Sequence, residues 1–448
     1  MDWPSDVRAI SALLPGEPVD TDHVTTTGTG ELASAFEVSR LLATSALHSV
    51  AAADGFGDRS DHRVIDLDQI AAYCTTHVEV DGESLPAWAD LSGVYPTADG
   101  RHIQLHCNFP HHARGVVDHL GTSDDRTAVA AAIAERNAFE LETALIERGM
   151  IGATIRTLDE WDRHPHAVAT SSLPLVDVEQ IGDADPRPAG EWSDVRVLDC
   201  SRVLAGPVSG SMLAGFGADV LRLGAEHLPS VPVGVISTGF GKRNTFVDLR
   251  TPEGSATVRS LFRQADVWID AFRPGAMAAL GCSSDAVAEQ SPGVVIIQIS
   301  AFDDVGPWSG RRGFDSILQS TTGVRAAGGA FARDSSGNAT DPGPTGLPVQ
   351  ALDYATGFLA AGVAAQLLSH QRRTGGSWLA RVSLLRTRNW LMGLGGPHPY
   401  VPTSPTVERH RLDSLDTDFG LVTAVRPFAG EWHHAPMPLG TSKPVWRL

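Results

Sequence analysis

One acidic side chain, Asp353, lies where carboxylate chemistry can be placed. It stands between an extended apolar segment that contains Pro348 and a stretch of small residues predicted to be helical up to His370. Because a proline disfavours a helix just before it, Asp353 is predicted to be the N-cap, with Thr356 three residues further on. The unpaired N–H groups of a first helical turn stabilise a carboxylate as the anion, and such an anion among Ala and Gly is a plausible nucleophile. An acid in this position is more often only a helix cap.

Histidines suggest a second kind of site, a metal centre. The histidines concerned are His102, His106, His111, His112, His164 and His166. His111 and His112 are adjacent, so both cannot easily face one metal from a helix, and the nearby carboxylates show no recognised zinc spacing. We therefore expect solvated or capping histidines and no metal.

Strands and helices alternate on both sides of Asp353. Strands are predicted at 195–199, 219–223, 245–249, 267–270, 294–300 and 378–383. This alternation is typical of a doubly wound α/β fold with a parallel sheet. Glycines in the first turn, at 205–210, permit a ligand to approach backbone N–H groups, or serve only strand–helix packing. The turn is not GxGxxG, and Gly224 stands where a ribose-binding acid would stand, which disfavours a nicotinamide enzyme.

The rest of the chain is predicted to form a smaller α+β domain and irregular ends. Residues 31–54 have the apolar spacing of an amphipathic helix, and 101–108 alternate as a half-buried strand. Further helices are predicted at 66–76, 109–121, 126–149, 158–163 and 384–394. A polar linker is predicted at 176–194 and a long loop region at 301–345. The predicted units are an irregular arm with a helix at 1–54, a small α+β domain at 55–180, a large α/β domain at 195–400 and an irregular tail at 401–448 that packs on the large domain.

Composition excludes some classes of partner. The chain has 448 residues, of which 42% are hydrophobic, and a net charge of −18. Such an acidic protein is a poor candidate for nucleic-acid binding, which depends mainly on Lys and Arg. Any anionic ligand therefore needs a local basic pocket.

Cysteine usage and the apolar runs suggest a compartment. The widely spaced cysteines, which suggest neither disulfides nor a metal, are Cys74, Cys107, Cys200 and Cys282. They are expected to be buried and reduced. The N-terminus does not resemble a secretion signal, and no uncharged apolar run reaches membrane-spanning length. We expect a cytoplasmic protein without a membrane partner.

Several motifs, in order, resemble the class III CoA-transferases. The first runs from Val197 to Pro207, and the next are at 213–222, 241–243, 247–254, 265–275 and 313–315. The last is at 348–357, where this family carries its nucleophilic aspartate four residues before a glycine; Asp353 fits that position. The family (CaiB/BaiF type) includes formyl-CoA, carnitine and bile-acid CoA transferases and the related acyl-CoA racemases.

The resemblance implies an activity and a set of binding residues. It implies an enzyme that moves CoA between an acyl-CoA and a free carboxylic acid through an aspartyl-CoA thioester on Asp353, with no permanently bound cofactor or metal. It also implies a Rossmann-like CoA-binding domain. The residues expected to bind coenzyme A are Arg202, Val203, Leu204, Ala205, Lys242, Arg243, Phe272, Arg273, Ala276, Arg312 and Phe314. The basic members of this set are expected to offset the CoA phosphates.

Domain order and assembly also follow from the resemblance. Residues 94–100 and the helices after them look like the small domain of the family, which here precedes the large domain instead of following it. Family members form interlocked homodimers, so a homodimer is implied.

Three departures keep other functions open. Gly224 stands where the family often has Glu, Ala271 where Asn is common, and no glycine-rich loop is found at 55–120. The racemase branch carries His where Phe314 stands, which argues against racemisation. The alternatives are an acyl-CoA racemase or isomerase with a different base, and a non-catalytic CoA-binding subunit.

Overall fold

The centre of the structure is a seven-stranded sheet. The computed structural model describes residues 2–57, 61–187 and 190–447. The strand order is β11-β10-β9-β12-β13-β14-β8, and all strands but β8 run parallel. In chain order the strands are β8 (Asp177–Gly182), β9 (Arg196–Cys200), β10 (Asp219–Gly224), β11 (Arg243–Phe246), β12 (Val267–Asp270), β13 (Val295–Ser300) and β14 (Ser377–Ser383). Counted from β9, the parallel strands stand in the order 3-2-1-4-5-6 of the doubly wound fold, so the predicted fold class is confirmed.

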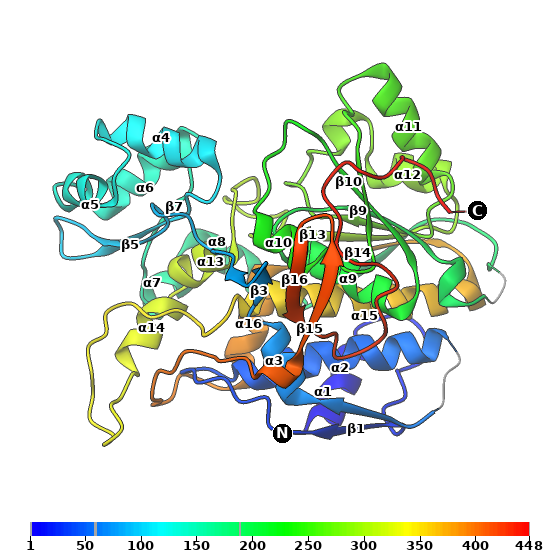
Figure 1. Cartoon of the computed structure of the whole chain (residues 1–448), viewed down its shortest axis with the longest axis horizontal. Helices are drawn as coiled ribbons and strands as arrows, with labels where there is room; N and C mark the ends of the chain where they lie inside the picture. Colours follow the sequence, from blue (N-terminus) through cyan, green and yellow to red (C-terminus); the bar gives the residue numbers. More distant parts are fainter. Residues whose placement is uncertain (1, 58–60, 188–189, 448) are drawn as a thin grey trace.

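Helices cover both faces of this sheet (Figure 1). Helices α9 (Ala205–Phe216) and α15 (Ala351–Thr374) pack on one face, and α11 (Pro252–Phe262) and α12 (Ser284–Gln290) on the other. Neighbouring strand residues such as Val197 and Leu198 enter the two opposite cores, because successive side chains point to opposite faces.

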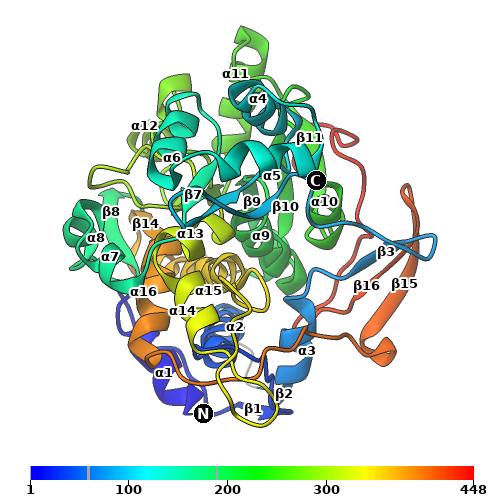
Figure 2. The same cartoon turned by 90° about the vertical axis from the view of Figure 1, so that its left-hand side faces the viewer.

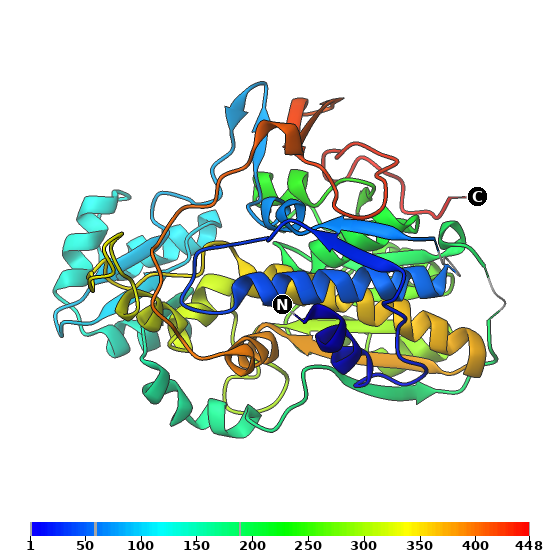
Figure 3. The ribbon, with the colours of Figure 1, turned by 90° about the horizontal axis from the view of Figure 1, so that it is seen from below.

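A further helix covers α15 from outside. Figure 3 shows α2 (Val38–Phe56) running along α15. It is the amphipathic helix predicted at 31–54, but residues 31–37 lie outside it. Helix α15 is long and apolar enough to cross a membrane by length and composition, and the whole of its apolar window is buried inside the protein. Its apolar character is therefore explained by packing between α2, α9 and the sheet.

The predicted small α+β part is present as a separate cluster, at the left of Figure 1. It contains strands β5 (Gly93–Pro96), β6 (His102–Leu105) and β7 (Gly152–Thr154) and helices α4 (Pro110–Leu120), α5 (Arg126–Ala134) and α6 (Ala138–Glu147). One long helix was expected at 126–149, but Asn137 caps a new helix there by accepting from the N–H groups of Phe139 and Glu140.

The predicted irregular arm at 1–30 is wrong in part. Helix α1 (Trp3–Ser11) begins after the cap residue Asp2 and buries an apolar stripe, and β1 (Val24–Thr27) pairs in parallel with β2 (Arg63–Asp66). These elements are short and mostly polar, so their periodicity is weak in the sequence.

The predicted irregular tail is also wrong in part. Strands β15 (Leu412–Thr417) and β16 (Gly420–Val425) form a hairpin, and β16 pairs with β3 (Val78–Val80), which pairs with β4 (Glu83–Ser84) (Figure 2). A pairing between such distant segments leaves no local signal. Strands β2 to β4 lie outside the small cluster, and the start of the small domain at residue 55 stays a prediction.

The predicted linker contains β8, which pairs antiparallel with β14 at the sheet edge. Arg381 on β14 forms ion pairs with Asp177 and Glu179 across this edge, so the strand is polar and resembles a linker.

The predicted loop region likewise contains two helices. The remaining helices are α3 (Leu67–Tyr73), α7 (Leu158–Asp162), α8 (Pro165–Thr170), α10 (Pro232–Ser237), α13 (Asp315–Thr321), α14 (Val324–Ala330) and α16 (Leu384–Leu394).

Candidate active site

Asp353 lies in the first turn of α15, at the carboxyl edge of the parallel sheet. The N-cap of this helix is Gln350, so Asp353 is the third helical residue and not the cap that was expected. The cap is supplied by a residue distant in the chain. Asp315, buried at the start of α13, accepts hydrogen bonds at Oδ2 from the backbone N–H groups of Leu352, at 2.8 Å, and of Asp353, at 3.0 Å.

The two carboxyl groups resist ionisation together. Burial, and then the neighbouring Asp315, raise the pKa of Asp353 well above its ordinary value, and the nearby Ala205 N–H offsets this only in part. Burial raises the pKa of Asp315 to about 6, although it accepts hydrogen bonds from Leu352, Asp353 and Gln319. The expectation of a resting ionised nucleophile is therefore corrected. Two adjacent buried acids hold a proton more tightly than one exposed acid does.

The predicted CoA-binding turn contacts the start of α15. Arg202 to Ala205 follow β9, Val203 has a left-handed φ of 74°, and Leu204 is the N-cap of α9. A left-handed valine is strained, which is a feature of functional turns. A Cβ on Gly357 would lie 2.6 Å from the Ala205 carbonyl oxygen, so only glycine permits this approach. The Ala205 N–H also lowers the pKa of Asp353 in part.

Two of the predicted phosphate-binding residues are placed elsewhere. Lys242 is fully buried, with Nζ 3.0 Å from Asp199 Oδ2 and 2.9 Å from the Pro207 carbonyl oxygen. Arg243 pairs with Asp219 at 2.8 Å, at the start of β11 and β10. Both cations already have acidic partners in the described conformation, and their binding of CoA phosphates stays a prediction.

Two other predicted cations remain available at the carboxyl edge. Arg273, after β12, is exposed, and Arg312, after β13, is half-buried. Both line a hollow of about 160 Å³, together with Gly149 and Met150 of the small cluster. Burial and the charge of Arg273 lower the pKa of Arg312, whose guanidinium donates to the Gly149 carbonyl oxygen at 3.1 Å. This cationic hollow is suited to a phosphate.

The other predicted binding residues surround the same edge. Phe272 is half-buried and packs on the core beneath α11, and Ala276 donates its N–H to the Arg273 carbonyl oxygen at 2.9 Å. Arg202 donates to the Pro229 carbonyl oxygen and lies 5.0 Å from the centre of the Phe109 ring.

Phe314, immediately before Asp315, lies against a histidine of the small cluster. The His106 ring stacks on Phe314 with 3.8 Å between centroids and 5° between planes. His106 is buried, and burial lowers its pKa to about 4, so its imidazole is neutral near pH 7. Among the histidines considered as metal ligands, His164 caps α8, and His166 donates through Nε2 to the Phe302 carbonyl oxygen. His106 therefore lies next to the predicted site residue Phe314, and His112 Nε2 lies 3.4 Å from the predicted site residue Arg312.

The sequence did not assign roles to Asp315 and His106. Asp315 is the last residue of the 313–315 motif, and its acidic side chain was the feature of the sequence that could have identified it as a site residue. His106 had no such signal, since its neighbour Phe314 belongs to a different part of the chain.

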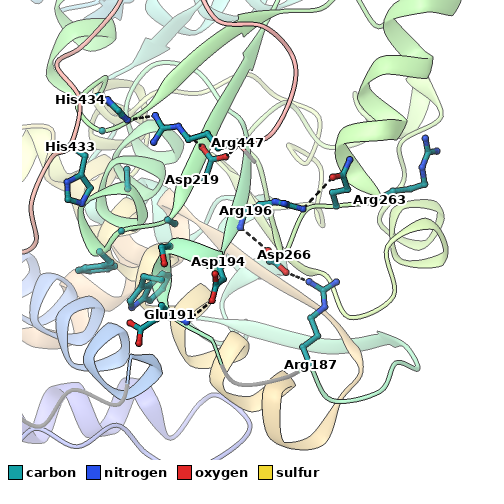
Figure 4. A pocket seen from close by; sticks show the side chains of 18 residues that line it. Arg187, Glu191, Asp194, Arg196, Asp219, Arg263, Asp266, His433, His434 and Arg447 are labelled. Carbon is teal, nitrogen blue, oxygen red and sulfur yellow. Dashed lines mark hydrogen bonds and ion pairs between the residues drawn. The ribbon is translucent and has the colours of Figure 1, made fainter.

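A larger hollow lies at the opposite, amino edge of the sheet (Figure 4). Its volume is about 960 Å³, and it is lined by charged residues of both signs. Asp266 pairs with Arg187 and accepts the Arg196 backbone N–H, while Asp219 holds Arg243 and contacts Arg447 at 3.9 Å. No carboxyl group described in this hollow approaches Asp353.

Comparisons with known proteins agree with the resemblance. Residues 192–410 match the model of CoA-transferase family III. A succinyl-CoA–D-citramalate CoA-transferase of Chloroflexus aurantiacus is 32% identical over 42% of this chain and 48% of the relative. A succinate–glutarate CoA-transferase of Agrobacterium fabrum is 31% identical over 41% of this chain and 48% of the relative. The crystal structure of a hypothetical protein from Mycobacterium tuberculosis is 26% identical, covers 47% of this chain and 58% of that chain, and has a TM-score of 0.39. The chain spans about half the length of the curated relatives it matches.

Proposed function

We propose that the protein is a CoA transferase that moves CoA between an acyl-CoA and a free carboxylic acid through a thioester on Asp353. One observation carries this proposal. The predicted nucleophile and the predicted CoA-binding turn are far apart in the sequence, yet Gly357 packs on the Ala205 carbonyl group and the Ala205 N–H lowers the pKa of Asp353. Such an amide can stabilise the oxyanion that forms when a carboxylate attacks a thioester.

The proposed reaction proceeds by exchange of acyl groups. An Asp353 carboxylate oxygen attacks the thioester carbon of the acyl-CoA, and CoA thiolate leaves, which gives a mixed anhydride. The thiolate then attacks the Asp353 carbonyl carbon of the anhydride, which forms the aspartyl-CoA thioester and releases the donor acid as a carboxylate. The acceptor carboxylate attacks this thioester, and the returning thiolate attacks the acceptor carbonyl carbon, so that the new acyl-CoA leaves and Asp353 is restored.

The resting site must lose a proton before the first step. The raised pKa of Asp353 favours the acid form, which is a poor nucleophile. We propose that Asp315 sets this requirement, because its carboxyl group lies at the start of the same helix and its charge opposes ionisation of Asp353.

Substrates and assembly are proposals as well. We propose that the CoA phosphates bind at Arg273 and Arg312, because these are the predicted cations that line a shared hollow. A homodimer and a cytoplasmic location also remain proposals, together with the absence of a permanently bound cofactor.

Transfer kinetics test the proposal. Asp353→Asn keeps the shape of the side chain but removes the nucleophile, and we expect transfer to fall by about 10³-fold or more. Asp285→Asn is the matched control, because Asp285 is an exposed acid in the first turn of α12, on the opposite face of the sheet. It should retain transfer near the wild-type rate. Equal activity of Asp353→Asn and the wild type would contradict the assignment.

A second candidate is an acyl-CoA racemase, and His106 is the observation that favours it. Its neutral imidazole lies against Phe314, where the racemase branch carries its own histidine. A racemase would exchange the α-hydrogen of a branched acyl-CoA for solvent deuterium, and His106→Gln would abolish that exchange. Transfer without any exchange favours the CoA transferase.

A further inference from the structure

The hollow assigned above to the CoA phosphates has walls from two distant parts of the chain. Arg273 and Arg312 come from the loops after β12 and β13, and the opposite wall comes from the small cluster. Arg312 donates to the Gly149 carbonyl oxygen at 3.1 Å, and its neighbour Arg311 donates to the Gly152 carbonyl oxygen at 3.1 Å. The loop that carries these two arginines therefore lies on the turn between α6 and β7.

An acid of the small cluster holds this loop. Glu142, on α6, is buried, and its Oε1 accepts a hydrogen bond from Arg311 Nη2 at 2.7 Å. Its Oε2 accepts from Arg156 Nη2, also at 2.7 Å. Burial raises the pKa of Glu142, but the charges of Arg311 and Arg156 outweigh burial, so the pKa lies below its ordinary value and the group is ionised near pH 7. A charged pair with this geometry, shielded from water, is a strong contact.

The Arg311 side chain is held on a second side, whereas Arg312 keeps its charge available. The Arg311 guanidinium lies 4.0 Å from the centre of the Trp308 ring, and the Arg311 N–H donates to the Trp308 carbonyl oxygen at 2.9 Å. The polar partners of Arg312 among the described residues are the Gly149 carbonyl oxygen and His112 Nε2, and neither is an acid. A binding group is effective only when contacts around it hold it close to the required position. Arg311 is thus the fixed point beside a cation that can receive a ligand.

From these contacts we infer that Glu142 is a positioning residue for CoA binding: by holding Arg311, it keeps the neighbouring guanidinium of Arg312 at the hollow that takes the CoA phosphates. This inference rests on the proposed function. One carboxylate faces two guanidiniums, Arg311 and Arg156, so the buried group retains a positive charge that also favours an anion in the hollow. CoA binding is thereby made to depend on the contact between the small cluster and the large sheet.

Binding and kinetics with matched thioesters test this role. Glu142→Gln keeps the shape of the side chain and removes the charge that holds Arg311, so the Kd for CoA, measured by calorimetry at one fixed salt concentration, should rise about tenfold. The KM for acyl-CoA should rise similarly. The KM for the pantetheine thioester of the same acyl group, which carries no phosphate, should stay within about twofold. A purely structural role of Glu142 would raise both KM values.

A second variant keeps the buried charge balanced. Glu142→Gln leaves two buried guanidiniums without a counter-charge, which is costly for folding. The double variant Glu142→Gln/Arg156→Met removes one acid and one cation, so the net charge of the buried group is unchanged while Arg311 still loses its partner. It should show the same rise in the Kd for CoA.

Arg156→Met is the matched control, because it removes the other cation from the same carboxylate and leaves Arg311 held. It should leave the Kd for CoA within about twofold of the wild-type value. An equal loss of CoA affinity in Arg156→Met would overturn the inference. Unchanged or tighter CoA binding by the double variant would overturn it as well, since the freed Arg311 would then serve the phosphates itself.

Calorimetry separates this inference from the proposed function, because it needs no transfer. Failure of the wild type to bind CoA would overturn the role of Glu142. CoA binding by the wild type without formation of a thioester on Asp353 would contradict the proposed function alone.

Discussion

The two edges of the large sheet both carry many charges, but they use them differently. At the amino edge, Asp219 holds Arg243, and Asp266 holds Arg187 beside a hollow of about 960 Å³. At the carboxyl edge, two buried acids lie together without a cation in contact, and Arg273 and Arg325 have no ion pair within the described residues. The amino edge is neutralised, whereas the carboxyl edge is left with unbalanced charge.

This difference indicates where chemistry is located. A large hollow lined by compensated ion pairs offers little free charge to a ligand. Acids whose pKa values are raised, next to cations with free donors, are typical of a functional site. In open parallel sheets ligands also bind at the carboxyl ends of the strands. These features favour the proposed placement of the chemistry at the carboxyl edge.

The largest expected effect is a loss of stability when Lys242, a cation held in a buried ion pair, is replaced. Lys242→Met leaves Asp199 as a buried, unpaired charge, so the free energy of unfolding should fall by about 3–5 kcal/mol. Urea denaturation measures this loss. The double variant Asp199→Leu/Lys242→Met should recover most of it. A Lys242→Met protein that is as stable as the wild type, and binds CoA more weakly, would restore Lys242 as a CoA ligand.

The next effect concerns the stability of the carboxyl pair. The folded-state pKa of Asp315, about 6, lies above the ordinary value of 3.8, so folding is favoured below that ordinary value and weakened as the pH rises to about 6. Asp315→Asn removes this ionisation and should raise the free energy of unfolding by about 1–3 kcal/mol at pH 7.5.

The gain should disappear towards pH 4, where the wild-type acid is protonated. Denaturation at the two pH values measures the difference. A variant that is less stable than the wild type at pH 7.5 would show that the helix-capping charge of Asp315 outweighs the penalty of burying it.

The substitution Asp315→Asn should also change the pH dependence of transfer, because it alters the ionisation of Asp353. Transfer needs the ionised form of Asp353, so its rate should rise with pH as the carboxyl pair loses its proton. With Asn at 315 the neighbouring charge is gone, and the rising limb should move to lower pH by about one unit. A pH–rate profile of wild type and Asp315→Asn decides this. Identical profiles would separate Asp315 from the ionisation of the nucleophile.

A smaller effect is expected for the exposed cation of the carboxyl edge. Arg273→Ala should weaken CoA binding by about tenfold, because one charge-assisted contact is lost, and should change stability by less than about 0.5 kcal/mol. Arg263→Ala, which changes an exposed arginine of the amino hollow, should leave CoA affinity unchanged. Calorimetry at one fixed salt concentration compares them. Equal losses of CoA affinity in the two variants would contradict the proposed difference between the amino and carboxyl edges.

The sequence predicts the parts of this site that depend on local pattern. Strand and helix periodicity predicted the strands of a doubly wound parallel sheet, and the motif around Asp353 predicted a helix whose start lies three residues after the observed N-cap, Gln350. The cap was assigned wrongly, because its true acceptor, Asp315, is separated from Asp353 by 38 residues. Local rules contain no information on such a contact.

The ion-pair partners of the basic residues could not be predicted from the sequence either. The sequence shows that Lys242, Arg243, Arg273 and Arg312 are basic, but not that the first two are held by Asp199 and Asp219 on neighbouring strands. The strands β8 and β16 were missed for a related reason, since each is defined by a partner strand distant in the chain.

The most direct test of the account is to trap the intermediate on Asp353. The protein is incubated with an acyl-CoA, treated with hydroxylamine, digested and analysed by mass spectrometry. We predict a hydroxamate on the peptide that contains Asp353, only after exposure to acyl-CoA, and none in Asp353→Asn. Continued transfer without any label at Asp353, or with the label on another acid, would contradict the account.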